Sequence, residues 1–118
     1  MNIDSTAKHS WEMVKRHYHA FRGDNGFQYG SIRAVVEYVC NHRLDDVLFG
    51  RTSHDMLIIS PYREYYKQER SLRISQIDQM VTCEAFDSKS NDYQTCGQCT
   101  ATEVEGMLEG CLTRIMQG

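Results

Sequence analysis

The spacing of apolar residues changes twice along this chain of 118 residues, and this change constrains the fold more than any other feature. Near the start, apolar residues recur every three or four positions, as on one face of an α-helix: Ala7, Trp11, Val14, Tyr18 and Phe21. Near the end the same spacing returns at Val104, Leu108, Cys111 and Ile115. Between them lie short apolar runs and alternating segments, which are typical of β-strands. The sequence therefore predicts helices at both ends and a sheet between them.

Capping residues set the boundaries of the first helices. The first helix is expected over residues 4–22, because Asp4 or Ser5 can cap its first turn and Gly23 can end it. A second helix is expected over residues 31–42, starting with a serine cap. Its β-branched residues lower its intrinsic helix propensity, so a strand is the alternative there.

The middle of the chain predicts about four strands, over residues 47–49, 56–59, 72–75 and 80–86. Residues 50–54 are expected to form a hairpin loop, and the polar segment 87–99, which lacks periodicity, a longer loop. The last helix is expected to begin at Thr100, which fits a capping box with Glu103. Strands that are grouped together favour an antiparallel sheet with helices on one face. We therefore predict a single α+β domain over residues 1–118.

Charge and composition narrow the class of protein. The net charge is −3 and the isoelectric point is about 5.9, which argues against a nucleic-acid-binding protein. No apolar run approaches the roughly 20 residues of a membrane-spanning helix, and residues 1–6 lack the features of a signal peptide. The five cysteines are an odd number, which favours free thiols and a cytoplasmic location.

Cys96 and Cys99 are the clearest candidates for chemistry, because two thiolates so close in sequence can bind zinc or form a disulfide. Their position before the predicted last helix favours the thiolate form. Cys83 is a candidate third zinc ligand, whereas Cys111 lies on the apolar face and is expected in the core. The first expectation is no cofactor, and zinc bound by Cys83, Cys96 and Cys99 is the alternative.

The segment Cys96-Gly97-Gln98-Cys99 resembles the redox motif of thioredoxin-like proteins over these four residues. In that family the motif lies in a strand-helix-strand context. Here the 19 residues after Cys99 predict a single helix, so the thioredoxin fold is not expected. A thiol-redox pair stays open as an alternative function.

A connection rich in tyrosine and arginine, between two predicted strands, is the best candidate for a binding surface. Tyrosine offers a large contact area and loses little rotamer entropy, and cations stack on aromatic rings. The candidate residues for binding a partner or ligand there are Tyr62, Arg63, Tyr65, Tyr66 and Arg70. A second candidate is an apolar pocket between the sheet and the first helix, lined by Trp11 and Tyr18.

No group of residues has the spacing that catalysis requires. The adjacent Ser53, His54 and Asp55 cannot form a triad, because neighbouring side chains on an extended chain diverge. We therefore expect a small cytoplasmic, non-enzymatic protein that binds or regulates another macromolecule, or that self-associates through its sheet edges. A small-molecule-binding domain or minor enzyme is one alternative, and a zinc or thiol-redox protein is the other.

Overall fold

A computed structural model describes residues 6–19, 30–53, 56–62, 70–77 and 80–116. Within these ranges the chain forms three α-helices, two short 3-10 helices and one sheet. In chain order the elements are α1 (Ala7–His19), α2 (Gly30–Asn41), η3 (Leu44–Asp46), β1 (Phe49–Ser53), β2 (Met56–Ser60), β3 (Leu72–Ile77), β4 (Met80–Asp87), β5 (Asp92–Thr100), η4 (Ala101–Glu103) and α3 (Val104–Met116). The order of helices and strands agrees with the sequence prediction.

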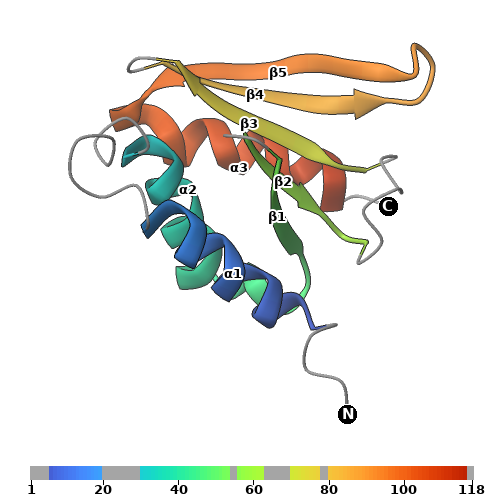
Figure 1. Cartoon of the computed structure of the whole chain (residues 1–118). Coiled ribbons are helices and arrows are strands. Elements are labelled where there is room, and N and C mark those ends of the chain that lie inside the picture. The colour runs from blue at the N-terminus through green and yellow to red at the C-terminus, as the bar shows by residue number, and fades with distance from the viewer. Residues whose placement is uncertain (1–5, 20–29, 54–55, 63–69, 78–79, 117–118) are drawn as a thin grey trace.

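The strands form one antiparallel sheet in the order β1-β2-β3-β4-β5. All three α-helices lie on the same face of this twisted sheet, as Figure 1 shows. These observations confirm the α+β class and the antiparallel sheet with helices on one face. The strand number differs, because the sheet has five strands where the sequence predicted about four.

The additional strand, β5, lies largely in segment 87–99, which the sequence predicted as a loop. It is the last strand of the sheet, so it pairs with β4 alone and much of it is exposed. A register shift between Cys83 and Glu84 also inserts one extra residue into β5. An exposed edge and a bulge both disturb the alternation that identifies a strand, which explains why the sequence pattern was missing.

The first strand begins later than predicted. Residues 50–53 belong to β1, although the sequence assigned them to a hairpin loop, and residues 47 and 48 precede it. Gly50 weakens the strand signal in the sequence. In the fold this glycine has a packing function, because a Cβ there would lie 2.9 Å from atoms of the Trp11 ring.

Helix α1 buries the predicted apolar face, which consists of Ala7, Trp11, Val14 and Tyr18. The helix is capped by Thr6, whose Oγ1 accepts a hydrogen bond from the His9 N–H at 3.0 Å. The remaining predicted residues of this segment lie outside the described part of the chain: Asp4, Ser5, Phe21 and Gly23.

The other two helices, α2 and α3, are stabilised by burial of their apolar faces. Helix α2 forms despite its weak propensity because it buries Ile32, Val35, Val36 and Val39 in the core. Helix α3 buries its predicted apolar face as well. Its start differs from the prediction: the Thr100 Oγ1 donates to the Glu103 carboxylate at 3.2 Å and caps no backbone amide. The predicted capping box is therefore wrong, and α3 begins at Val104 after η4.

Candidate metal and thiol site

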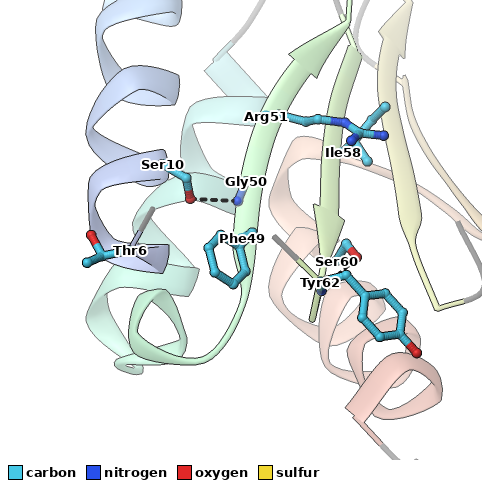
Figure 2. Close-up of a pocket in the computed structure, with 8 residues that line it drawn as sticks. All are labelled: Thr6, Ser10, Phe49, Gly50, Arg51, Ile58, Ser60 and Tyr62. Carbon is cyan, nitrogen blue, oxygen red and sulfur yellow. Dashed lines mark hydrogen bonds between the residues drawn. The ribbon is translucent and has the colours of Figure 1, made fainter. Parts of the chain in front are cut away.

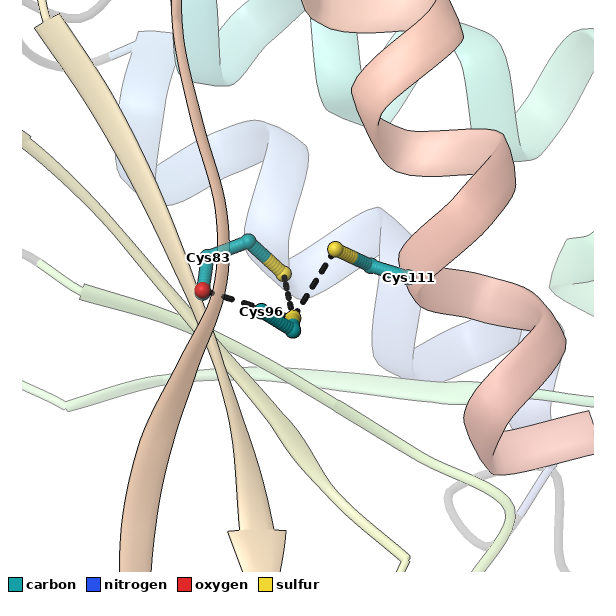
Figure 3. Close-up of side chains that lie close together, drawn as sticks. All are labelled: Cys83, Cys96 and Cys111. Carbon is teal, nitrogen blue, oxygen red and sulfur yellow. Dashed lines mark hydrogen bonds between the residues drawn. The ribbon is translucent and has the colours of Figure 1, made fainter.

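Three cysteine sulfur atoms meet between the sheet and helix α3 (Figure 3). Cys83 comes from β4, Cys96 from β5 and Cys111 from α3. The Cys96 Sγ lies 2.8 Å from the Cys111 Sγ and 3.5 Å from the Cys83 Sγ. All three sulfurs lie within 4.8 Å of one another. Cys83 and Cys111 are buried and Cys96 is half-buried, so Cys96 is the most exposed residue of the cluster.

A β-bulge turns the Cys96 side chain toward helix α3. Glu84 pairs with Thr95 and Cys83 pairs with Gly97, so two residues of β5 oppose Cys83. In a regular strand the neighbours Cys96 and Gly97 would point to opposite faces. The extra residue breaks this alternation, and the Cys96 sulfur joins that of Cys83 beneath α3. There it also lies 3.3 Å from the Cys83 carbonyl oxygen, which can accept a hydrogen bond from the protonated thiol.

Side chains of helix α3 pack directly against strand β5 at Gly97. A Cβ at this position would lie 2.7 Å from the Met107 Cγ and 3.2 Å from the Cys111 Sγ. The Met107 Sδ itself lies 3.7 Å from the Cys111 Sγ. The absence of a side chain at Gly97 therefore lets a thioether sulfur pack beside the three thiols.

The three thiols of the cluster have different pKa values. Hydrogen bonds with Cys111 and with Cys83 lower the pKa of Cys96, and the positive charge of Arg114 adds to this effect. Hydrogen bonds to Cys111 and Cys96, together with burial, raise the pKa of Cys83. For Cys111 the hydrogen bond to Cys83 lowers the pKa, but the hydrogen bond to Cys96 and burial outweigh it and raise the pKa overall. Cys96 is therefore the first thiol of the cluster to lose its proton.

The cluster differs from the predicted set of ligands at one residue. Cys99, which the sequence grouped with Cys83 and Cys96, is not part of it, and Cys111, which the sequence assigned only to the core, is. Three steps along an extended strand span about 10 Å, so Cys99 cannot share an ion with Cys96 as it would in a tight loop. Helix α3 begins at Val104, so neither thiol lies in its first turn. Burial and the nearby Glu103 raise the pKa of Cys99.

Two of the predicted binding residues are core residues. Trp11 and Tyr18 are 1% and 2% exposed. The Trp11 Nε1–H donates to the Leu48 carbonyl oxygen at 2.8 Å, and the indole ring covers Gly50. These side chains therefore fill the space between α1 and the sheet, where the sequence predicted that they would line a pocket.

The tyrosine- and arginine-rich connection is described only at its ends. Tyr62 borders a cavity of about 190 Å³ at the margin between α1 and β1 (Figure 2), lined also by Thr6, Ser10, Phe49, Gly50, Arg51, Ile58 and Ser60. The Arg70 guanidinium donates to the Ile115 carbonyl oxygen in the last turn of α3 and so anchors that helix. Arg63, Tyr65 and Tyr66 lie outside the described residues.

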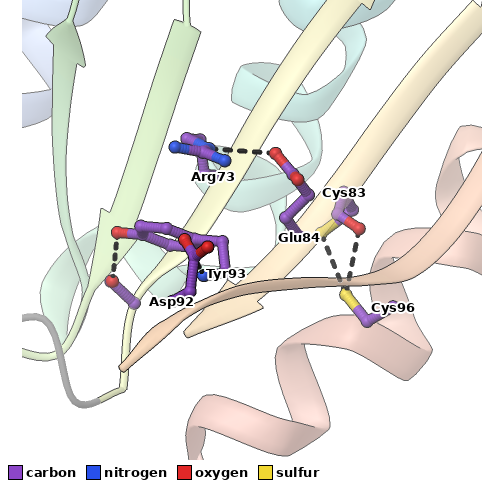
Figure 4. A network of polar contacts seen from close by, with 7 residues as sticks. Arg73, Cys83, Glu84, Asp92, Tyr93 and Cys96 are labelled. Atoms are coloured by element: carbon purple, nitrogen blue, oxygen red, sulfur yellow. Dashed lines mark hydrogen bonds and ion pairs between the residues drawn. The ribbon is translucent and has the colours of Figure 1, made fainter. Parts of the chain in front are cut away.

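A polar network that the sequence did not reveal crosses three neighbouring strands (Figure 4). The Arg73 Nε donates to the Glu84 carboxylate at 2.9 Å, and its guanidinium lies 4.3 Å from the centroid of the Tyr93 ring. The Tyr93 hydroxyl lies 2.7 Å from the Ser71 hydroxyl. The hydrogen bond to Glu84 raises the pKa of Arg73. Because cross-strand partners share a face, these side chains lie on the sheet face opposite the buried Cys83.

Comparison of the chain with protein-family models, with curated proteins and with solved structures finds no match. In the part of the chain that the structure describes, no helix has both the length and the apolar character needed to cross a membrane. The chemistry of the thiol cluster is therefore the main structural guide to function.

Proposed function

We propose that this chain is a small, non-enzymatic binding protein in which Cys83, Cys96 and Cys111 hold one soft metal ion, with zinc favoured. The observation that supports the proposal is the convergence of three sulfurs, from three separate elements, within 4.8 Å of one another. Thiolate sulfur is the ligand type that zinc and other soft ions prefer in proteins. Such an ion would join β4, β5 and α3 at the open end of the sheet.

One of the two sulfur separations at Cys96 is near the value that a tetrahedral zinc ion needs. Zinc–sulfur bonds of about 2.3 Å hold neighbouring sulfur ligands about 3.8 Å apart. The Cys83–Cys96 separation of 3.5 Å is close to this value, and the Cys96–Cys111 separation of 2.8 Å must widen by about 1 Å. Rotation of a cysteine side chain moves its sulfur while the backbone stays in place. The elements that carry the thiols therefore need not move.

The fourth coordination position distinguishes this site from a closed structural zinc site. The described metal-binding groups include no fourth cysteine, histidine or carboxylate in the cluster. Zinc with three protein ligands keeps an open position for water or an incoming group. The Met107 Sδ lies 3.7 Å from the Cys111 Sγ and is a further sulfur beside the cluster. The positive charge of Arg114 favours the thiolates and so favours loading of the ion.

Metal titration of the reduced full-length chain tests this proposal. We expect one zinc ion per chain in competition with a zinc-binding dye, and thiolate-to-metal absorption when cobalt replaces zinc. Cys96→Ser and Cys111→Ser should each lower the zinc affinity by roughly 100-fold or more. The matched controls are Cys99→Ser, on the same strand but outside the cluster, and Cys40→Ser on α2. A chain that binds no zinc, or a C99S variant that loses as much affinity as C96S, would contradict the proposal.

The macromolecular partner, the self-association and the cytoplasmic location that the sequence predicts stay proposals. Free thiols are consistent with a reducing compartment, and all five cysteines are unpaired. A regulatory protein could use the ion to stabilise β5, which forms one edge of the sheet. Analytical ultracentrifugation with and without zinc tests self-association, and a species that stays monomeric in both states would count against it.

The cavity at Tyr62 supports a second candidate function, the binding of a small molecule. Its lining combines the apolar Phe49 and Ile58 with Arg51 and hydroxyl groups. Its volume of about 190 Å³ is below the roughly 300–1,000 Å³ of ordinary ligand pockets, so only a small ligand would fit. A thermal-shift screen should then give a hit that Tyr62→Ala abolishes and Cys96→Ser does not. A hit that survives Tyr62→Ala would place the ligand elsewhere.

A further inference from the structure

We propose that Cys96 and Cys111 form a reversible disulfide when the reduced, metal-free protein meets hydrogen peroxide, and that this bond withdraws two of the three thiols from the metal site. The disulfide itself depends only on the geometry of the thiol cluster. The release of metal rests on the proposed function. The proposal therefore makes the cluster a modification site as well as a binding site.

The geometry favours one of the two pairs that include Cys96. The Cys96–Cys111 sulfur separation is 2.8 Å and the Cys96–Cys83 separation is 3.5 Å. A disulfide bond is about 2.05 Å long, so the first pair must close by about 0.8 Å and the second by about 1.5 Å. Cys96 and Cys111 also lie on different kinds of element, a bulged edge strand and a helix. The bond therefore requires the two sulfurs to approach by less than about 1 Å.

Access to solvent selects Cys96 as the thiol that meets the oxidant. Cys96 is half-buried, whereas Cys83 and Cys111 are buried. Cys96 also lies on β5, which has a neighbouring strand on one side only. Of the three cysteines, Cys96 is therefore the one that we expect to react first with peroxide.

The reaction is a two-electron oxidation in two steps. The Cys96 sulfur attacks one oxygen of hydrogen peroxide, the O–O bond breaks, and a sulfenic acid and water form. The Cys111 sulfur then attacks the Cys96 sulfur, the S–O bond breaks, and a second water leaves with the thiol proton. In total, two thiols and one peroxide give one disulfide and two waters. A small dithiol such as dithiothreitol reverses the reaction by exchange and is itself oxidised.

The disulfide removes two of the three proposed metal ligands. Once Cys96 and Cys111 are joined, Cys83 is the single thiol left in the cluster. One thiol cannot hold a zinc ion that needs three protein ligands. Oxidation and metal binding therefore exclude each other, and bound zinc should slow the reaction with peroxide.

The test treats the reduced, metal-free full-length chain with a stoichiometric amount of hydrogen peroxide. Because the chain has five cysteines, we expect thiol titration after denaturation to fall from five to three. Peptide mapping should identify a Cys96–Cys111 link, and dithiothreitol should restore all thiols. Cys96→Ser and Cys111→Ser should abolish this link. Cys99→Ser and Cys40→Ser, the matched controls outside the cluster, should retain it.

Defined outcomes overturn the inference. A link from Cys96 to Cys83 or Cys99, or sulfenic and sulfinic products without any disulfide, would contradict the pairing. If the disulfide forms but the reduced chain binds no zinc, the pairing stands and the proposed function and the metal release fail. If zinc binds but no disulfide forms, the proposed function stands and this inference fails. If both occur, peroxide should release zinc to a chromophoric chelator, and retention of zinc by the oxidised chain would overturn the metal release.

Discussion

Two glycines in different parts of the sheet admit a helix side chain at very short range, and their surroundings differ. Gly50 on β1 lies under the Trp11 ring of α1, and a Cβ there would lie 2.9 Å from the ring atoms. Gly97 on β5 lies under Met107 of α3, and a Cβ there would lie 2.7 Å from its Cγ. We refer to these as the Gly50 contact and the Gly97 contact. In both contacts a glycine makes room for a helix side chain. At Gly50 this is the rigid Trp11 ring, and at Gly97 it is the flexible Met107 side chain.

Two hydrogen bonds accompany the Gly50 contact. The Trp11 indole N–H donates to the Leu48 carbonyl oxygen at 2.8 Å, and the Gly50 N–H donates to the Ser10 hydroxyl at 3.0 Å. The second bond runs from β1, the first strand of the sheet, to α1, so the helix covers that edge. Every polar group named here is satisfied, which is the arrangement of a stable core.

The Gly97 contact is surrounded by sulfur. Cys111 and Met107 come from α3, and Cys83 and Cys96 from the sheet. Thiols form only weak hydrogen bonds, but they bind soft metals and undergo oxidation. The two contacts therefore differ in what they provide. The Gly50 contact at β1 stabilises the core, and the Gly97 contact at β5 brings together thiols that can bind a metal or be oxidised.

The largest expected effect tests the first half of this comparison. Trp11→Ala removes the buried indole and leaves a cavity against Gly50, and it should lower the free energy of unfolding by about 3–5 kcal/mol. Urea unfolding followed by circular dichroism measures this change. Trp11→Phe is the control, because it keeps a ring but loses the hydrogen bond to Leu48. A loss below about 1 kcal/mol for Trp11→Ala would show that this contact is not part of the stable core.

The second prediction compares the two glycines directly. Gly50→Ala should destabilise the fold by about 1–3 kcal/mol, because the buried indole cannot move away from a new Cβ. Gly97→Ala should cost less than about 1 kcal/mol, because the unbranched Met107 side chain can adopt another rotamer. The measurement is again urea unfolding, of the metal-free chains. Equal losses for the two variants would mean that the Gly97 contact is as rigid as the Gly50 contact.

The sequence predicted much of the fold because burial follows periodicity. The apolar faces of α1, α2 and α3 and the inward-facing residues of the strands lie in the core as their spacing indicated. The alternation of β4 placed Cys83 inward, and the helical spacing placed Cys111 inward as well. The two patterns therefore predicted that Cys83 and Cys111 face the core, but neither pattern predicted that they meet.

The bulge at Cys96 could not be predicted in the same way. It depends on the register between β4 and β5, where Cys83 pairs with Gly97 and Glu84 with Thr95. Register is a property of two strands together, and the sequence pattern of one strand does not contain it. The short spacing of Cys96 and Cys99 favoured a tight loop, and the apolar face of the last helix favoured a core position for Cys111. A buried cysteine on an apolar helix face fits both a core and a cluster, and spacing alone does not separate them.

The third prediction concerns reactivity at two cysteines on β5. Iodoacetamide should modify Cys96 at least roughly tenfold faster than Cys99 at pH 7, because the thiolate is the nucleophile. The pKa of Cys96 is lowered by its hydrogen bonds with Cys111 and Cys83, whereas the pKa of Cys99 is raised by burial. As the pH rises from 7 to 9, the rate at Cys99 should therefore increase and the rate at Cys96 should change little. Mass spectrometry of quenched samples measures both rates, and similar rates at pH 7 would contradict the prediction.

The smallest expected effect is that of Met107→Leu, which tests whether Met107 is a metal ligand. Met107→Leu conserves volume, so it should change the free energy of unfolding by less than about 1.5 kcal/mol. If the cluster binds zinc through its three thiols with water in the open position, this variant should also keep its zinc affinity within a few-fold, in the same dye competition. A loss as large as that of Cys96→Ser would instead make the Met107 thioether a fourth ligand. Gly97 would then serve to position a ligand, whereas Gly50 serves only to admit a ring, and the two contacts would differ in function as well as in rigidity.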